Sequence, residues 1–134
     1  MKNEKTLKGT IKSKPYHRGH FQDGVIFYNE KGENIAIAFD IAQRCCENYN
    51  YDIPKELLQD KILTAEGITI TIEHETKDKG GDTYGSVDFR VSTQEKTKRN
   101  RKSYLIYCNN THNGYYCHEV AIGENGEYTW NYFI

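Results

Sequence analysis

Residues 67–74, GITITIEH, carry the pattern that most restricts what this chain can fold into. Ile68, Ile70 and Ile72 alternate with polar residues, mostly threonine, so the isoleucines share one face of an extended segment. This alternation is typical of a β-strand with one buried face. It therefore predicts a strand over residues 62–74 and a sheet in which that strand has neighbours.

The rest of the chain also favours strands. It has only two prolines and many β-branched and aromatic residues between glycine-containing turns, which is typical of antiparallel sheets. The expected strands are residues 7–12, 25–28, 35–39, 62–74, 86–92, 104–108 and 128–133, with short helices at residues 40–47 and 55–59. We therefore expect an α+β fold, a mostly antiparallel β-sheet of hairpins with one or two short helices packed on one face. A chain of 134 residues has the length of one compact domain, so residues 1–134 are assigned to a single domain.

Two segments predict hairpin turns. Gly32 predicts one over residues 29–34, and Asn113-Gly114 supplies the positive φ angles of a type I′ turn. The second turn sets a register in which one apolar face packs on the helices; its residues are Leu105, Tyr107, Val120 and Ile122. The opposite face is mixed and is expected to meet water, a ligand or another subunit; it carries Cys108, Asn110, Tyr115, Cys117 and Glu119, with Cys108 opposite Glu119.

Charge and composition exclude several function classes. The net charge of -1 and the pI near 6.5 give no global field for nucleic acid or an anionic membrane. No apolar run is long enough for a membrane span or a signal peptide, so we expect a cytoplasmic protein whose four cysteines are reduced.

Metal and catalytic motifs are weak. His17-x-x-His20 has a spacing compatible with zinc, but the chain has no Cys-x-x-Cys pair. Cys117 and His118 are neighbours in a predicted strand, so their side chains point to opposite sides rather than forming a nucleophile and its base. We therefore expect no metal, no cofactor and no enzymatic activity.

Four arginines are candidates for binding a phosphate group. Arg101 belongs to the basic segment of residues 96–102, KTKRNRK. This segment is expected either to be a solvated loop or to bind a phosphate through an arginine. Arg99 shares that segment. Arg44 and Arg90 lie in predicted regular elements, which hold a guanidinium more rigidly than a loop does, although each can instead pair with a carboxylate such as Glu47 or Glu119.

Several segments together resemble a known family. They are LKGTI (7–11), VIFYNEKGENIAIAF (25–39), RCCEN (44–48), ILTAEG (62–67), SVDFR (86–90) and above all NGYYCHEV (113–120). In this order they resemble a family of small phage and prophage proteins of largely unknown function that includes the Thoeris anti-defense sponge proteins. The resemblance covers residues 7–122. The family's Arg-Trp pair before the last hairpin is absent here, because this chain has Tyr107-Cys108.

The resemblance implies a phage protein that evades immunity. Such a protein binds and sequesters a cyclic nucleotide immune signal, a cyclic ADP-ribose isomer or a cyclic oligonucleotide, without cleaving it. Phe89 or Tyr115 would stack on the base, Asn113 and Glu119 would contact hydroxyl groups, and the phosphates would be held by Arg44, Arg90 or Arg101.

Tight binding of a small ligand needs near-complete enclosure, so we expect a homodimer or higher homo-oligomer. Two other functions remain open. A phage inhibitor would bind a host defence protein instead of a small ligand, and a nucleotide-cleaving enzyme would release an altered product. Nucleic acid and membranes are not expected partners.

Overall fold

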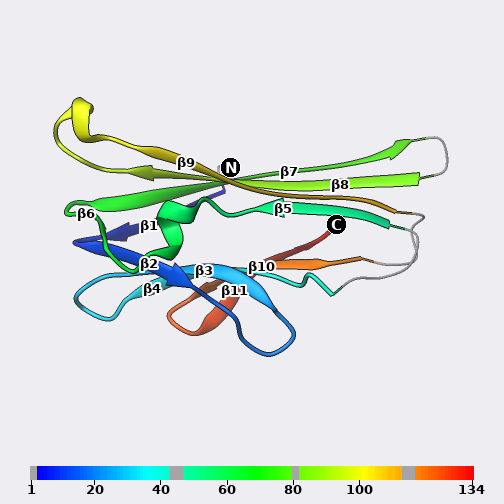
Figure 1. Ribbon diagram of the computed structural model, residues 1–134, viewed down its shortest axis with the longest axis horizontal. Coiled ribbons are helices and arrows are strands. Elements are labelled where there is room, and N and C mark those ends of the chain that lie inside the picture. Colours follow the sequence, from blue (N-terminus) through cyan, green and yellow to red (C-terminus); the bar gives the residue numbers. More distant parts are fainter. Residues whose placement is uncertain (1–2, 43–46, 80–81, 113–116) are drawn as a thin grey trace.

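In the computed structural model the chain forms two antiparallel sheets that lie face to face (Figure 1). The structure describes residues 3–42, 47–79, 82–112 and 117–134. Sheet A has five strands in the order β1 (Glu4–Lys8), β7 (Gly67–Lys79), β8 (Asp82–Thr93), β9 (Ser103–His112) and β5 (Glu47–Asp52). Sheet B has six, in the order β11 (Glu127–Phe133), β10 (Glu119–Glu124), β4 (Asn34–Phe39), β3 (Asp23–Tyr28), β2 (Ile11–Pro15) and β6 (Ile62–Thr64).

The alternating isoleucines lie where their pattern predicts. Ile68, Ile70 and Ile72 point from β7 into the space between the sheets, where all three are buried. The opposing face of that core comes from sheet B, with Phe27, Ile37 and Ile122 among its fully buried side chains. The predicted hairpin at residues 29–34 is also confirmed, since β3 and β4 pair from Asp23↔Phe39 to Tyr28↔Asn34.

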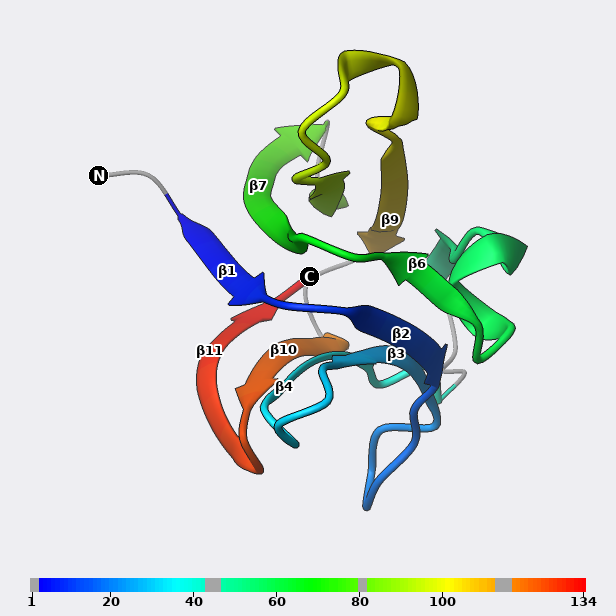
Figure 2. The same ribbon diagram turned by 90° about the vertical axis from the view of Figure 1, so that its left-hand side faces the viewer.

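Two predicted strands are each divided between the sheets. The segment predicted as residues 7–12 leaves sheet A after Lys8 and enters sheet B at Ile11, as Figure 2 shows for β1 and β2. Gly9 lies between them with a φ of +102°, a conformation that favours glycine. The segment predicted as residues 62–74 is likewise divided into β6 of sheet B and β7 of sheet A. The two crossings are adjacent, because the Gly9 N–H donates to the Glu66 carbonyl.

The predicted helices are replaced by shorter elements. Residues 55–59 contain one 3-10 turn, η1 (Lys55–Leu58), and a second turn, η2 (Lys98–Asn100), lies between β8 and β9. In the predicted helix at residues 40–47, residues 40–42 have no helical structure, residues 43–46 lie outside the described part, and Glu47 begins β5. Within the described residues the fold is therefore a mostly antiparallel β-sandwich, and the helical part of the α+β prediction is not found there.

The predicted pairing of the last hairpin is wrong. Cys108 of β9 pairs with Val87 and Tyr51 in sheet A, whereas β10 pairs with β4 and β11 in sheet B. The predicted outer face of β9 is consequently its inner face: Ile106 and Cys108 are fully buried, while Leu105 is 39% exposed. Side chains alternate between the two faces of a strand, so an error in the face of β9 exchanges the buried and exposed residues along that strand. The turn residues Asn113 and Gly114 lie outside the described part.

Aromatic rings close one side of the sandwich beside β11. Trp130 packs edge-on against Phe89, with ring centroids 5.9 Å apart, and Tyr132 lies 4.4 Å from the ring of His74 on β7. The contacts join the edge of sheet B to sheet A. None of the helices in the described residues has the length and apolar character needed to cross a membrane.

Candidate functional site

The predicted ligand-binding residues that the structure describes are dispersed. Phe89 is fully buried in the core, where its ring centroid lies 6.2 Å from that of Phe39. Arg90 is exposed on the outer face of sheet A. Arg101 lies after η2 and donates from its Nε to the Glu95 carbonyl at 2.8 Å. Glu119 begins β10, so these four residues do not form one site.

Glu119 lies on the outer face of sheet B and contacts the loop between β2 and β3. Its Oε1 lies 2.8 Å from Nε2 of His20, and its Oε2 accepts from Asn131 at 3.1 Å. The His20 ring therefore contacts the Glu119 carboxylate, whereas the His17-x-x-His20 spacing suggests a shared zinc ion. Among the described residues, no group of three or more His, Cys, Asp or Glu side chains is arranged to hold a metal ion.

The remaining three predicted residues, Arg44, Asn113 and Tyr115, lie outside the described residues. The strands that flank their segments meet at one place, since Glu47 at the start of β5 pairs with His112 at the end of β9. Tyr49 of β5 then reaches the residue just before β10, with its ring centroid 4.0 Å from that of His118. Tyr49 and His118 therefore bring β5 and the start of β10 together at one aromatic contact.

A pocket of about 170 Å³ opens at this contact. We call it the aromatic slot; it is lined by Ile41, Tyr49, Tyr51 and His118. Tyr49 and Tyr51 alternate with asparagines in the sequence ENYNYD, so β5 turns both rings toward sheet B. The slot is lined by rings and one aliphatic side chain, a composition suited to a flat aromatic group.

Internal hydrogen bonds fix the rings of the slot. The Cys108 thiol donates to the Tyr49 hydroxyl at 3.0 Å, and the Tyr51 hydroxyl donates to Asp23 Oδ2 at 2.8 Å. His118 Nδ1 lies 2.8 Å from the Asp40 carbonyl, and because a carbonyl only accepts, Nδ1 carries the proton of this bond. The rings are therefore held in place before any ligand arrives.

The Cys108 thiol and the hydroxyls of Tyr49 and Tyr51 keep their protons at neutral pH. Burial raises the pKa of the Cys108 thiol to about 12, and burial together with the neighbouring Asp23 carboxylate raises the pKa of Tyr51 to about 12. Burial also raises the pKa of Tyr49. A thiol with such a pKa is a poor nucleophile, because the thiolate is the reactive form. The arrangement suits binding better than thiol chemistry.

Sequence reasoning missed Tyr49 and Tyr51. The helix predicted at residues 40–47 conceals the period-two pattern that begins at Glu47. The alternation of tyrosine with asparagine was the signal that identifies the strand. No protein-family model matches this chain, and neither a curated protein nor a solved structure matches it.

Proposed function

We propose that this protein binds and sequesters a cyclic nucleotide immune signal, such as a cyclic ADP-ribose isomer, without cleaving it. The observation that carries the proposal is the aromatic slot at the contact between Tyr49 and His118. In the sequence, His118 of the slot belongs to NGYYCHEV and Tyr49 directly follows RCCEN, two of the segments that carry the resemblance to phage anti-defense proteins. A slot of fixed rings suits the flat base of a nucleotide.

In this proposal the base enters the slot, and three residues that lie outside the described part supply the polar contacts. Arg44 would hold a phosphate, and Asn113 and Tyr115 would contact the sugar and the exposed face of the base. The proposal gives no role to three of the predicted contacts. Phe89 is buried in the core, Arg90 lies on the outer face of sheet A, and Arg101 lies in the loop that contains η2. Glu119 lies next to His118 in sequence but is bonded to His20 and Asn131 on the outer face.

Sequestration without cleavage is supported by the protonation of the groups around the slot. A raised pKa leaves Cys108 as a thiol at neutral pH, so it is not ready to attack a phosphate or a glycosidic carbon. Binding of an intact signal requires only affinity. The proposed role would be carried out in the cytoplasm of an infected bacterium, where the signal is made.

The size of the slot favours an assembly. About 170 Å³ is less than the roughly 300–1,000 Å³ of a typical small-molecule site, so the slot of one copy would receive a base but would not enclose a whole cyclic ADP-ribose isomer. A second copy of the chain would cover the remainder of the ligand. We therefore propose a homodimer or higher homo-oligomer as the binding species.

Calorimetric titration of the protein with cyclic ADP-ribose isomers and cyclic oligonucleotides tests this proposal. Tyr49→Leu removes the aromatic face and is expected to weaken binding at least tenfold, whereas Tyr49→Phe keeps the face and serves as the matched control. Urea midpoints of both variants verify that they fold. Equal affinity of the two variants for the ligand would show that the aromatic slot does not bind the base. Binding of a host defence protein, with no small ligand bound, would favour the inhibitor function instead.

A further inference from the structure

The outer face of sheet B has a hollow floored by small side chains. Ala36 of β4 pairs directly with Gly123 of β10, and Ile26 of β3 pairs with Ala36 on its other side. The neighbouring row of the same face is equally small, because Ala38 pairs with Ala121. Alternation along the strands places these residues opposite the core face, so they form a shallow trough on the outside of the sandwich.

One half of this trough is filled by the chain itself. Phe21, from the loop between β2 and β3, packs on Ala38 and Ala121 and is only 2% exposed. Figure 1 shows this loop and the β10–β11 turn both projecting from the side of sheet B that faces away from sheet A. The other half of the trough, over Ala36 and Gly123, remains a hollow of about 160 Å³.

Aromatic and polar side chains form the walls of the open half. Tyr16 and Arg18 come from the β2–β3 loop, Tyr128 from β11 and Asn34 from the start of β4. The hydroxyls of Tyr16 and Tyr128 are 3.0 Å apart, and the ring centroid of Tyr128 lies 5.2 Å from that of Phe21. The same loop that fills one half of the trough thus builds the wall of the other.

The polar groups at the hollow are mainly donors. Arg18 lines the hollow and is exposed. Burial and the bond to Tyr16 raise the pKa of Tyr128 to about 12, so its hydroxyl stays neutral. In the tyrosine pair one O–H donates to the other oxygen, which leaves the second O–H to donate to a ligand. The nearby Glu119 carboxylate is bonded to His20 and Asn131.

We infer that this hollow is a second binding site, for a small phosphate monoester that carries a single ring. The phosphate would meet the Arg18 guanidinium and the tyrosine hydroxyls, and the ring would lie on the Ala36 and Gly123 floor against Tyr128. The volume suits one sugar or base with its phosphate. This site lies on the outer face of sheet B, whereas the aromatic slot lies between the sheets, so the inference does not depend on the proposed function.

Amide chemical-shift titrations with ribose 5-phosphate, ribose and inorganic phosphate test the inference. Ribose 5-phosphate is expected to shift the amides of Arg18, Gly123 and Gly126 saturably, with ribose and inorganic phosphate binding at least tenfold more weakly. Equal binding of inorganic phosphate would overturn the role of the ring, and equal binding of ribose would overturn the role of the phosphate.

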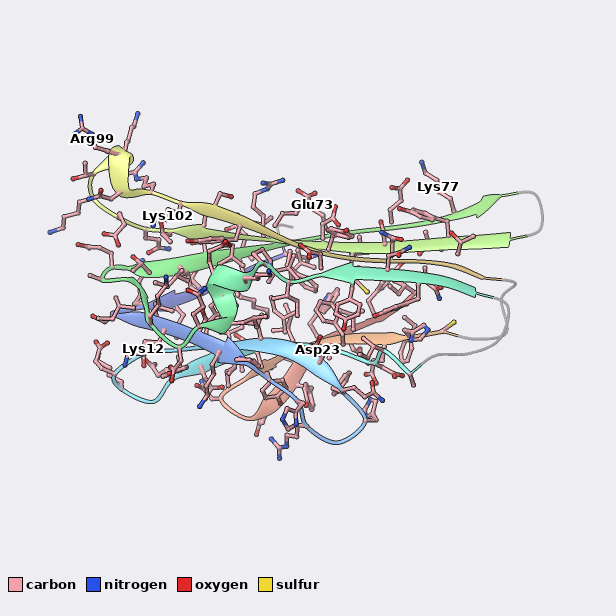
Figure 3. The ribbon with its side chains drawn as sticks, in the orientation of Figure 1. Lys12, Asp23, Glu73, Lys77, Arg99 and Lys102 are labelled. Carbon is pink, nitrogen blue, oxygen red and sulfur yellow. The ribbon has the colours of Figure 1, made fainter. Side chains whose placement is uncertain are left out.

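Two substitutions of the same type provide the control. Arg18→Gln is expected to weaken binding of ribose 5-phosphate at least tenfold, and Arg99→Gln, which makes the same change in charge at the far tip of the β8–β9 loop (Figure 3), is expected to have no effect. Both residues are exposed, so both variants should fold. Tyr49→Leu should leave these shifts unchanged, which separates this site from the slot. Unaltered affinity of Arg18→Gln, or shifts confined to other amides, would overturn the inference.

Discussion

The rings of Tyr49 and His118 lie 4.0 Å apart between centroids and join the edge strand of sheet A to the residue that precedes β10 in sheet B. Each ring makes a hydrogen bond to the protein. The Tyr49 hydroxyl accepts from the Cys108 thiol, and His118 Nδ1 donates to the Asp40 carbonyl. The contact therefore defines a rigid wall at a place where the two sheets approach each other. A ligand that enters the aromatic slot would bind to a surface that is already ordered, which lowers the entropic cost of binding.

Phe89 is expected to be a stability residue rather than a ligand contact. Phe89→Ala should lower the free energy of unfolding by about 3–5 kcal/mol, because it removes a fully buried ring that packs on Phe39 and Trp130. Its neighbour Arg90 is exposed on the outer face, so Arg90→Ala should change that energy by less than about 0.5 kcal/mol. Urea unfolding measures both. Equal small effects would contradict the placement of Phe89 in the core.

Stability is expected to fall in alkaline solution. The pKa of Cys108 rises from 9.0 to about 12 on folding and that of Tyr51 from 10.0 to about 12, so between pH 9 and 12 the unfolded state binds fewer protons than the folded state. The stability is fully present below pH 9 and is lost as the pH rises through this window. Urea midpoints at increasing pH measure the loss. Cys108→Ala should make the midpoint less dependent on pH; an unchanged dependence would contradict a buried, protonated thiol.

The two described cysteines should differ in reactivity. Cys117 is exposed, whereas Cys108 is buried and donates to Tyr49. Brief alkylation of the native protein at pH 8, followed by peptide mass spectrometry, should label Cys117 at least tenfold faster than Cys108, because burial protects the thiol and raises its pKa. Unfolding in urea should remove the difference. Rapid labelling of native Cys108 would show that the strand face assigned to it is wrong.

Gly24 is expected to tolerate no side chain. A Cβ at this position would lie 2.2 Å from the Ile37 carbonyl oxygen, which belongs to the neighbouring backbone of β4. Gly24→Ala should therefore destabilise the protein by about 1–3 kcal/mol or more through overpacking. Gly32→Ala is the comparison, because its Cβ would meet no atom within 4 Å, although its φ of +84° still favours glycine. A larger loss at Gly32 than at Gly24 would contradict the close approach of β3 and β4.

Local sequence patterns predicted where the strands lie better than they predicted which strands pair with one another. The alternation of Ile68, Ile70 and Ile72 and the turn at Gly32 specify elements through adjacent residues alone. Whether consecutive strands share a sheet depends on contacts between distant segments, which no local pattern encodes. The chain crosses between sheets at Gly9, and β9 and β10 lie in different sheets despite the hairpin dipeptide between them.

The candidate sites were harder to predict for the same reason. Tyr49 and His118 are far apart in the sequence, and their contact exists only because β5 lies at the edge of sheet A and β10 lies between β11 and β4 in sheet B. The hollow on sheet B depends on Ala36 and Gly123 being paired, which follows from the position of β10 beside β4. Glu119, a predicted ligand contact, lines neither the slot nor the hollow, because its carboxylate is bonded to His20 of the β2–β3 loop and to Asn131.

Capture and release of an intact signal tests the central proposal most directly. The purified protein would be incubated with cyclic ADP-ribose isomers and cyclic oligonucleotides and filtered, and the bound compound would be released by heat and identified by mass spectrometry. The proposal predicts depletion of one compound and its recovery unaltered. An altered product would show that the protein is an enzyme, and no depletion of any compound would contradict sequestration of a nucleotide signal.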